Sequence, residues 1–273
     1  MSVYKNLLFI GGGNIAGAVA LGLVSSGAVP AEKISVYDID ASKLEKFSKV
    51  GIKTFSALSD AVNDVQYIFL AVKPAIVKAV MQELSNFDGL LDNAVVISFA
   101  ASVEIDHIEK ACDKHIAVIR TMPSTPILVG EGVLAVCRND KVSSKDFQFF
   151  CRMMSSVAHV TVISESLMNP IISVHGSSPA YVYLFVKSMV EAAEKQGIDP
   201  EVSLPLILKT VKGSIAMIEK SDVSLEQLIS NVASPNGTTL AALNSFSDDD
   251  FSGSVERAML RCTERANEIS KEL

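Results

Sequence analysis

Clusters of lysine or arginine, CxxC pairs and low-complexity tracts are all missing from this chain of 273 residues, whose net charge is −7. Without clustered positive charge the chain lacks the electrostatic footprint that phosphate backbones require, so we expect no nucleic-acid partner. No histidine stands at metal-ligand spacing from a cysteine, so we expect no bound metal and free thiols in a reducing compartment. The four cysteines are Cys112, Cys137, Cys151 and Cys262.

Formal charge is also missing from residues 7–29, a run long enough to span a bilayer as a helix. Three consecutive glycines at positions 11–13, followed by Asn14, would break such a helix near its middle, because glycine is a poor helix former. Lys5 and the later alanines mimic the basic and cleavage regions of a signal peptide only superficially. We therefore predict no membrane segment and a cytoplasmic protein.

The glycines lie between a strand pattern and a helix pattern. Residues 6–10 (NLLFI) form a short apolar block typical of a buried strand, and residues 15–24 are apolar and helical in character. Gly11, Gly13 and Ala16 fit the pattern G-x-G-x-x-A, in which the first glycine permits a tight turn and the second lets a pyrophosphate approach the backbone. The small third residue permits close helix packing, and the helix N-terminus faces the anion. A glycine-rich turn of any α/β protein is the alternative.

The next strand pattern supports dinucleotide binding. The segment KISVYDID alternates apolar and polar residues and leads to Asp38, whose carboxylate could hydrogen-bond a ribose 2′-hydroxyl. Asp38 follows the turn by roughly twenty residues, where that acid is expected. The predicted cofactor cradle consists of Gly11, Gly13, Asn14, Ile15, Ala16 and Asp38.

Strand-like blocks recur with helical segments between them in the first part of the chain, which predicts an α/β fold with an N-terminal Rossmann-like doubly wound parallel sheet. Long amphipathic segments follow, which predicts a C-terminal all-helical domain. We expect a dinucleotide-binding domain over residues 1–163 and a helical substrate-binding and dimerisation domain over residues 164–273. The predicted strands are NLLFI, KISVYDID, YIFLAV, AVVISF, HIAVIRTM and GVLAVC.

Three further stretches carry candidate binding residues. AVKP (residues 71–74) and RTMPSTP (residues 120–126) follow strand ends, where open α/β sheets bind ligands, although prolines that merely end strands would look the same. In SPNGTT (residues 234–239) a turn leads into a helix whose unpaired N–H groups and hydroxyls could hold a carboxylate, unless the segment is an ordinary helix cap. The cofactor contacts selected from the first two stretches are Ala71, Val72, Lys73, Pro74, Met122 and Pro123.

Together these segments resemble the pyrroline-5-carboxylate reductase family over nearly the whole chain. The likeness is carried by FIGGGNIAGAVALGL, LAVKP, RTMPSTPILVGEG, HGSSPAYVYLFVKSMVEAA, VASPNGTTLAALNSF and GSVERAMLRCTERANEI. The sequence departs from the usual pattern of the family at four positions: Ser102 and Ser178 replace glycines, Ser124 replaces an asparagine, and Asn236 interrupts a glycine pair.

The resemblance implies transfer of a hydride from NAD(P)H to the C=N carbon of 1-pyrroline-5-carboxylate, a small imino acid, to give L-proline. Because the substrate nitrogen can arrive protonated, the site has to position the iminium and requires no strong general acid. By resemblance, the amides of Gly237, Thr238 and Thr239, together with Ser234, bind the substrate carboxylate. The Thr239 hydroxyl then holds the ring nitrogen as the catalytic contact. The resemblance also implies that this loop faces the nicotinamide bound to a partner subunit.

Two other functions remain open from the sequence. Lys187 lies on a predicted helix, as does the acid/base lysine of 3-hydroxyacid dehydrogenases, but Glu191 stands where those enzymes often have an asparagine. A solvated or interface charge is therefore the preferred interpretation of Lys187. A non-catalytic nucleotide-sensing protein would share the fold, although it would not need the anion site in SPNGTT. Four scattered histidines are interpreted as structural: His107, His115, His159 and His175.

Asp38 also bears on the choice of cofactor. Its carboxylate would repel a 2′-phosphate, and the nearest cation after it is Lys43, so we predict that NADH is used at least as well as NADPH. The helical segments at 180–190 and 255–269 carry much apolar surface for a small domain, which predicts a homodimer through the helical domain. By resemblance, such dimers can assemble further into a decamer.

Overall fold

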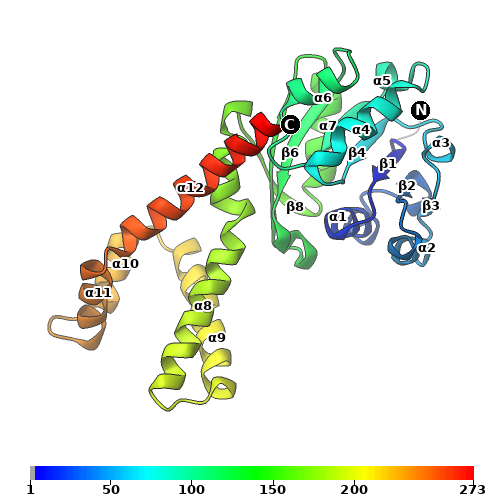
Figure 1. Cartoon of the computed structure of the whole chain (residues 1–273). Coiled ribbons are helices and arrows are strands. Elements are labelled where there is room, and N and C mark those ends of the chain that lie inside the picture. The colour runs from blue at the N-terminus through cyan, green and yellow to red at the C-terminus, as the bar shows by residue number, and fades with distance from the viewer. Residues whose placement is uncertain (1–3) are drawn as a thin grey trace. The chain divides into compact units, whose positions relative to one another are not determined.

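The computed structural model describes residues 4–273, which form two compact units. The first unit contains the chain up to Ser177 together with Cys262–Leu273, and the second contains Ser178–Arg261. The first is built around a sheet, whereas the second consists of helices and loops (Figure 1). Among the described residues, none of the helices is long and apolar enough to cross a membrane.

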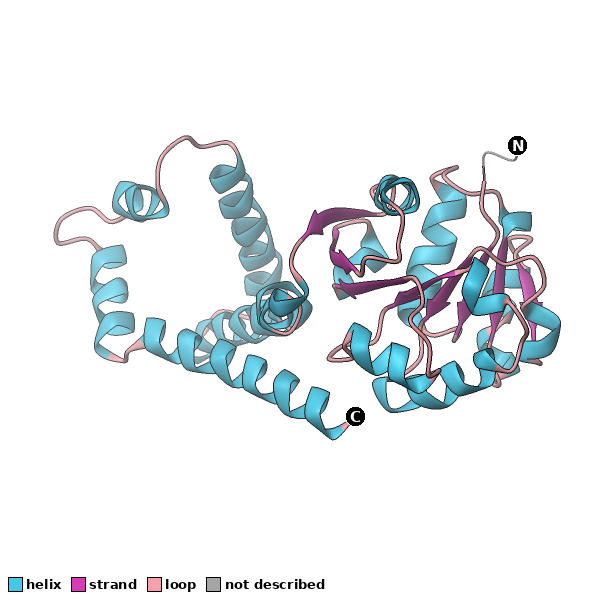
Figure 2. Cartoon of the chain, turned by 90° about the horizontal axis from the view of Figure 1, so that it is seen from above, coloured by secondary structure: helices cyan, strands magenta, loops and turns pink. Residues whose placement is uncertain are grey.

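A sheet of eight strands forms the centre of the first unit, as described for residues 4–273 (Figure 2). The strand order is β3-β2-β1-β4-β5-β6-β7-β8, and its first six positions match the doubly wound order of dinucleotide-binding folds. β1 lies between β2 and β4, so the strand order reverses beside it. The strands are β1 (Leu7–Ile10), β2 (Ile34–Tyr37), β3 (Lys53–Phe55), β4 (Tyr67–Leu70), β5 (Val95–Ser98), β6 (Val118–Pro123), β7 (Gly132–Arg138) and β8 (Ala158–Val162).

The sheet is parallel from β3 through β6, but β7 runs antiparallel to β6. The connection between β6 and β7 is short and contains only the helical turn η3 (Thr125–Val129) with its flanking residues. Because a parallel crossover needs a dozen or more residues, the chain has to return in the opposite direction. β8 then pairs parallel to β7 after a crossover through α7 (Ser144–Met154).

The six predicted strands are present, and the structure contains two further strands, β3 and β8, that were not predicted. β3 is only three residues long and includes an exposed lysine, so its apolar signal is weak. β8 has the sequence AHVTV, whose alternating apolar residues could have identified it. The helical prediction for the later part of the chain is confirmed, because no strand occurs in the described residues after Val162.

Helices cover both faces of the sheet, so its apolar residues form two cores. Along β1, Leu7 and Phe9 pack into one core with α1, while Leu8 and Ile10 pack into the other with α4. This alternation follows from the two-residue period of a strand. Burial on both faces explains why the strand is apolar throughout. The helices of this unit are α1 (Asn14–Ser25), α2 (Glu45–Ser48), α3 (Leu58–Ala61), α4 (Pro74–Ser85), α5 (Leu90–Asn93), α6 (Ile105–Ala111) and α7, with short helical turns at Ala31–Lys33, Ala41–Lys43, Glu165–Leu167 and Ile172–Gly176.

The second unit buries almost none of its side chains on its own. In residues 178–261 only Ser203 and Ile207 are buried. Although α8 (Ser178–Lys195) packs against α9 (Pro200–Glu219), the apolar faces of these helices therefore remain largely exposed within the unit. The unit also contains α10 (Leu225–Val232), α11 (Thr238–Asp248) and the first part of α12 (Phe251–Glu272), whose residues from Cys262 onward belong to the first unit.

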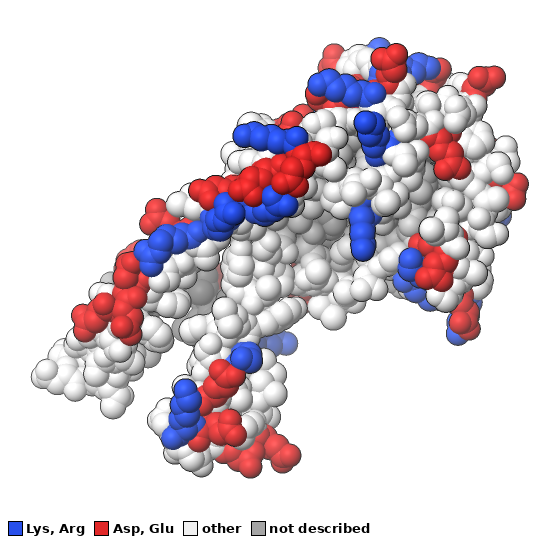
Figure 3. Space-filling view, in the orientation of Figure 1, with Lys and Arg blue, Asp and Glu red and all other residues white. Residues whose placement is uncertain are grey.

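Charges of both signs alternate along α12 on the face that Figure 3 shows. Arg257 pairs with Asp250 at 2.8 Å, and Arg265 pairs with Glu268 at 2.8 Å and with Glu272 at 2.7 Å. These pairs, between residues three or seven positions apart, balance one another locally. The exposed side of α12 is therefore a mixed surface without a patch of one sign.

Candidate functional site

The turn after β1 requires glycine at Gly11. Its φ is +102°, in the region that favours glycine, and a Cβ built there would lie 2.6 Å from the Ala71 carbonyl oxygen. The Gly11 amide donates a hydrogen bond to the Tyr37 carbonyl oxygen at 2.8 Å. The turn is therefore held between the ends of β2 and β4, as expected for the first glycine of a dinucleotide motif.

Gly13 is the N-cap of α1 and borders open space, because a Cβ built there meets no atom within 4 Å. No side chain caps this helix, so the amides of Asn14, Ile15 and Ala16 have no partner within it. A helix N-terminus of this kind, with room beside its glycine, fits the pyrophosphate of a dinucleotide. Ala16 is buried in the core, as close packing at the third motif position requires.

Asp38, which follows β2, uses its carboxylate to hold the glycine turn. Its Oδ2 accepts a hydrogen bond from the Gly12 amide at 2.7 Å, and its Oδ1 accepts one from the Asp40 amide at 2.8 Å. The residue is only 6% exposed. The acid of the motif therefore supports the loop, a role that its position in the sequence does not reveal.

Two lysines approach the same turn from the segment after β2. Lys43 Nζ lies 3.5 Å from Asp38 Oδ1, and Lys46 Nζ donates a hydrogen bond to the Gly13 carbonyl oxygen at 3.2 Å. Burial lowers the pKa of Lys46 below its usual value. Lys43 is the cation expected from the sequence, and Lys46 is a second one that was not expected. The spacing of three residues, which places side chains on one face of a helical segment, could have indicated it.

The other predicted cofactor residues lie at the same edge of the sheet. Residues 71–73 connect β4 to α4, and Pro74 takes the first position of α4, where a missing N–H is tolerated. Met122 and Pro123 lie inside β6 at its carboxyl end, whereas the predicted strand HIAVIRTM ends at Met122. Because β1, β4, β5 and β6 are parallel, their carboxyl ends meet at this edge, where open α/β sheets bind ligands.

A π-helix over Ile172–Gly176 contacts the end of β6. His175 Nε2 donates a hydrogen bond to the Met122 carbonyl oxygen at 2.8 Å, since a carbonyl can only accept. A Cβ built on Gly176 would clash with the Met122 side chain, so the two segments approach closely. This contact was not expected from the sequence, and π-helices are frequent at functional sites.

The segment 234–239 forms a tight turn and the start of α11. Asn236 has a φ of +59°, a left-handed conformation that asparagine tolerates better than most residues. Gly237 is the N-cap of α11, and a Cβ built there would clash with Ser234 Oγ. A larger residue at this position would therefore displace the Ser234 side chain.

The Gly237 amide donates to the Ser234 carbonyl oxygen at 3.0 Å, which corrects the expectation that it is free to bind a carboxylate. No side chain caps α11, so the amides without a partner in the helix are those of Thr238, Thr239 and Leu240. The amides that could bind an anion therefore begin one residue later than expected. Thr239 lies within it and is half-buried, whereas Thr238 is exposed.

Lys187, the acid/base candidate of the dehydrogenase alternative, forms an ion pair with Glu191 at 2.7 Å along α8. Its side chain is 67% exposed. The pair has the geometry of a solvated i,i+4 contact, which agrees with the preferred interpretation of this lysine.

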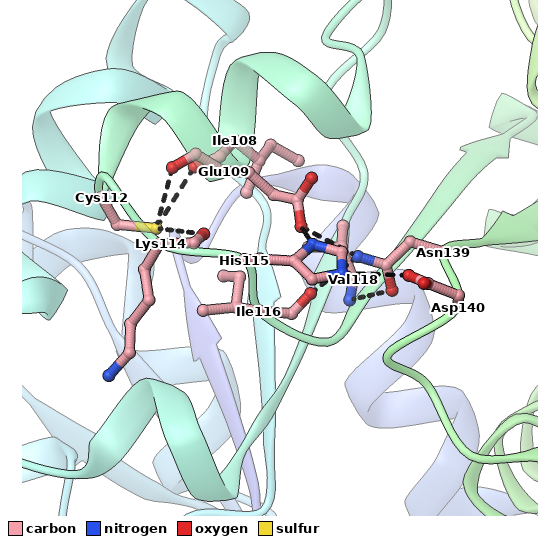
Figure 4. A network of polar contacts seen from close by, with 9 residues as sticks. All are labelled: Ile108, Glu109, Cys112, Lys114, His115, Ile116, Val118, Asn139 and Asp140. Carbon is pink, nitrogen blue, oxygen red and sulfur yellow. Dashed lines mark hydrogen bonds and ion pairs between the residues drawn. The ribbon is translucent and has the colours of Figure 1, made fainter.

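A polar network surrounds His115 at the amino end of β6 (Figure 4). The ring contacts Glu109 through Nδ1 and Asp140 through Nε2, the latter at 3.1 Å. Asn139 Nδ2 also donates to Glu109 Oε1 at 3.2 Å. Since β6 is parallel to β5 in the sheet that holds β1, this network lies at the edge opposite the glycine turn. It is therefore separate from the candidate site.

The four cysteines are free, as predicted. Burial raises the pKa of Cys137 to about 12, and burial also raises the pKa of Cys112 and of Cys151. Within residues 4–273, no group of three or more His, Cys, Asp or Glu side chains could hold a metal ion.

Two family models match the chain. One, described as pyrroline-5-carboxylate reductase dimerisation, matches residues 165–269, and the other, NADP oxidoreductase coenzyme F420-dependent, matches residues 6–102. The pyrroline-5-carboxylate reductase of Pasteurella multocida is 34% identical over 98% of each chain. The chain belongs to the pyrroline-5-carboxylate reductase family. The Escherichia coli family member is 32% identical over 98% of this chain and 99% of its own.

Solved structures of pyrroline-5-carboxylate reductases share the fold. Pyrroline carboxylate reductase from Plasmodium falciparum, solved with NADP bound, has a TM-score of 0.89 at 29% identity and covers 97% of this chain and 98% of its own. The Coxiella burnetii reductase has a TM-score of 0.88 at 31% identity, with the same coverage. The predicted fold class, a Rossmann-like α/β sheet followed by a helical part, is confirmed.

Proposed function

We propose that this chain is a pyrroline-5-carboxylate reductase, which uses a reduced nicotinamide dinucleotide to convert 1-pyrroline-5-carboxylate into L-proline. The observation that carries the proposal is the uncapped N-terminus of α11, in a chain whose likeness to such enzymes extends over its full length. A protein that only senses a dinucleotide has no need of this second anion site.

The first unit supplies the cofactor site. Gly11 forms the turn, Gly13 leaves room for the pyrophosphate, and the amides at the start of α1 donate to it. Asp38 is assigned to the ribose by its motif position. When bound, the cofactor supplies the hydride. The residues assigned to cofactor binding are Gly11, Gly13, Asn14, Ile15, Ala16, Asp38, Ala71, Val72, Lys73, Pro74, Met122 and Pro123.

The turn before α11 supplies the substrate site. The amides of Thr238, Thr239 and Leu240 bind the substrate carboxylate, and Ser234 closes the turn over Gly237. The Thr239 hydroxyl holds the ring nitrogen. Since that nitrogen arrives protonated, hydride addition to the C=N carbon gives the neutral amine of the ring without a further proton transfer in that step. The protein therefore acts mainly by positioning.

Cofactor preference follows from the charge of Asp38. Its buried carboxylate disfavours a 2′-phosphate on the ribose that the motif assigns to it, and Lys43 at 3.5 Å offsets only part of that charge. We propose that NADH is used at least as well as NADPH.

The helical part forms a homodimer in this proposal. Large apolar side chains are left exposed in the second unit, and a helical unit that buries so little alone commonly completes its core with a partner. Further assembly of dimers into a decamer rests on the family resemblance. The exposed apolar side chains of the second unit include Tyr183 at 66%, Leu184 at 63%, Leu206 at 63%, Met217 at 63% and Val232 at 69% exposed.

Functionally, residues 1–163 are assigned to the cofactor and residues 164–273 to substrate binding and dimerisation. We place the protein in the cytoplasm, because a biosynthetic reductase depends on a supply of reduced dinucleotide. No nucleic-acid partner is proposed, in keeping with the net charge of −7.

A single assay tests the reaction and the cofactor together. The protein is mixed with 1-pyrroline-5-carboxylate and either NADH or NADPH, the loss of reduced nicotinamide is followed by absorbance, and proline is quantified. Absence of proline with both cofactors would contradict the reductase. A preference for NADPH above about tenfold, or about 1.4 kcal/mol, would contradict only the cofactor preference. Small 3-hydroxy acids with the oxidised cofactors test the dehydrogenase alternative.

Sedimentation of the same sample tests the assembly. A monomer at micromolar concentration with full activity would contradict the dimer.

A further inference from the structure

The last turn of α12 is tied to the loop after β5. Ser270 Oγ donates a hydrogen bond to the Ser102 carbonyl oxygen at 2.6 Å, although the two residues lie 168 positions apart. They are almost completely buried, at 4% and 3% exposed. Because water cannot replace a hydrogen bond lost at such a site, the contact is costly to break.

Hydrogen bonds behind Ser270 set the direction of this contact. The buried guanidinium of Arg120 can only donate, and its Nη2 donates to Asn169 Oδ1 at 2.7 Å. The amide nitrogen of Asn169 must therefore point away from Arg120. It donates to Ser270 Oγ at 3.1 Å and to Asn267 Oδ1 at 3.0 Å. Since Ser270 Oγ already accepts this bond, its single hydrogen is directed to the Ser102 carbonyl.

The loop at residues 99–103 has an unfavourable backbone conformation that needs support. Ser102 has a φ of +63°, which residues other than glycine rarely adopt. The start of the loop is fixed independently, because Thr121 Oγ1 donates to the Ser98 carbonyl oxygen at 2.8 Å and the Ala100 amide donates to Ser98 Oγ at 3.2 Å. At the far end of the loop, Ser270 of α12 holds the Ser102 carbonyl, and the Glu165 carboxylate accepts from the Ile105 amide just beyond it.

This loop lies at the ligand-binding edge of the sheet. The Phe99 amide donates to the Leu70 carbonyl oxygen at 3.0 Å, so the loop begins beside residues 71–74. In doubly wound folds each half of the sheet binds one nucleotide, on either side of the point where the strand order reverses. Asp38 lies in the half that holds β2, which is assigned to the adenosine. The loop after β5 therefore belongs to the nicotinamide half.

We propose that Ser270 is a positioning residue whose hydroxyl, oriented by Arg120 and Asn169, holds residues 99–103 in the conformation that the nicotinamide half of the cofactor requires. The inference rests on the proposed function only for the identity of the cofactor. A merely structural network would dock the end of α12 without affecting how the nicotinamide binds.

Ser270→Ala tests the hydrogen bond directly. Thermal unfolding is measured together with the dissociation constants of NADH and of ADP-ribose, which lacks the nicotinamide. We expect NADH to bind about three- to tenfold more weakly, as for the loss of one buried hydrogen bond, with ADP-ribose unchanged. Ser270→Thr keeps the hydroxyl and should restore NADH affinity. Ser252→Ala, at an exposed position of the same helix, is the matched control and should change neither ligand.

Asn169→Asp keeps the size of the side chain and the hydrogen bond from Arg120, but it replaces the amide that donates to Ser270 and Asn267 with an oxygen that can only accept. The carboxylate adds a second charged partner for Arg120, which already pairs with Glu165 at 3.3 Å, so the fold is retained. It also accepts the Ser270 hydrogen and draws it away from Ser102. We expect the same loss of NADH affinity as in Ser270→Ala, at an unchanged or higher melting temperature.

The proposal is wrong if these two variants lower the melting temperature but leave NADH affinity intact, or if they weaken NADH and ADP-ribose equally. Failure of Ser270→Thr to restore binding would also overturn it. A wild-type protein that binds NADH but reduces no 1-pyrroline-5-carboxylate contradicts the proposed function instead. The binding comparison would then still decide the role of Ser270.

Discussion

The carboxylate of Asp38 and the backbone amide of Gly12 are hydrogen-bonded at 2.7 Å, across 26 positions of the sequence. This contact joins the end of β2 to the turn after β1. The acid assigned to the ribose therefore also shapes the loop assigned to the pyrophosphate, and a change at Asp38 alters two parts of the cofactor site together.

Asp38→Asn should weaken NADH binding about ten- to a hundredfold, because the variant loses charge-assisted hydrogen bonds worth about 1.5–3 kcal/mol. In asparagine an NH₂ group, which can only donate, replaces one of the two carboxylate oxygens. One of the hydrogen bonds from the Gly12 and Asp40 amides is therefore lost. The affinity for NADPH should not increase, because the disturbance of the loop offsets the loss of repulsion between Asp38 and the 2′-phosphate. Calorimetric dissociation constants for both cofactors check this, with the exposed Asp40→Asn as control. Tighter NADPH binding in Asp38→Asn would show that the acid acts only at the ribose.

Gly11→Ala should lower mainly the stability of the fold, whereas Gly13→Ala should lower mainly the affinity for the cofactor. At Gly11 the left-handed backbone costs about 1–3 kcal/mol for alanine, and the clash with Ala71 adds to it, so the melting temperature should fall. At Gly13 a Cβ meets nothing within 4 Å, so the melting temperature should hold while NADH affinity drops. Thermal unfolding and dinucleotide titration provide the two measurements. Unchanged affinity in Gly13→Ala would mean that the pyrophosphate does not approach this turn.

Thr239→Val should lower kcat/KM roughly ten- to a hundredfold, because it keeps the shape and removes one hydrogen bond to a partly charged group, worth roughly 1.5–3 kcal/mol. Dinucleotide affinity should hardly change, since the cradle belongs to the other unit. Thr238→Val is the matched control, because only its backbone amide is assigned a role. Steady-state kinetics of both variants checks this. Full activity in Thr239→Val together with a loss of activity in Thr238→Val would assign the contact with the ring nitrogen to Thr238 instead.

Cys137 should resist alkylation in the native protein. Because burial raises its pKa to about 12, its thiolate fraction at pH 8 is about one part in ten thousand. The fraction grows with pH, so the rate with iodoacetamide should rise about tenfold per pH unit between roughly pH 7 and 10. Peptide mapping by mass spectrometry gives the rate at each cysteine. A plateau above about pH 9 would indicate an ordinary thiol and contradict the effect of burial.

The main elements of the fold and most of the candidate site follow from local sequence patterns. A strand buried on both faces has to be apolar throughout, and a tight turn with positive φ favours glycine, so the segment NLLFIGGGNIA indicates a strand, a turn and a helix without further information. The same holds for SPNGTT, where Gly237 and the following threonines mark the start of α11. The sequence also placed Asp38 near the end of the second strand pattern.

Only the tertiary structure decided which polar groups these elements leave free, because hydrogen-bond partners depend on distances between segments far apart in the chain. The sequence does not show that Asp38 accepts from Gly12 or that the Gly237 amide is already bonded to Ser234. Ser270 and Ser102 are separated by even more of the sequence. Their contact supports a serine with a left-handed backbone conformation, which no local preference favours. Residue type and period are local properties that sequence records, whereas the pairing of a buried donor with its acceptor is set by how the whole chain packs.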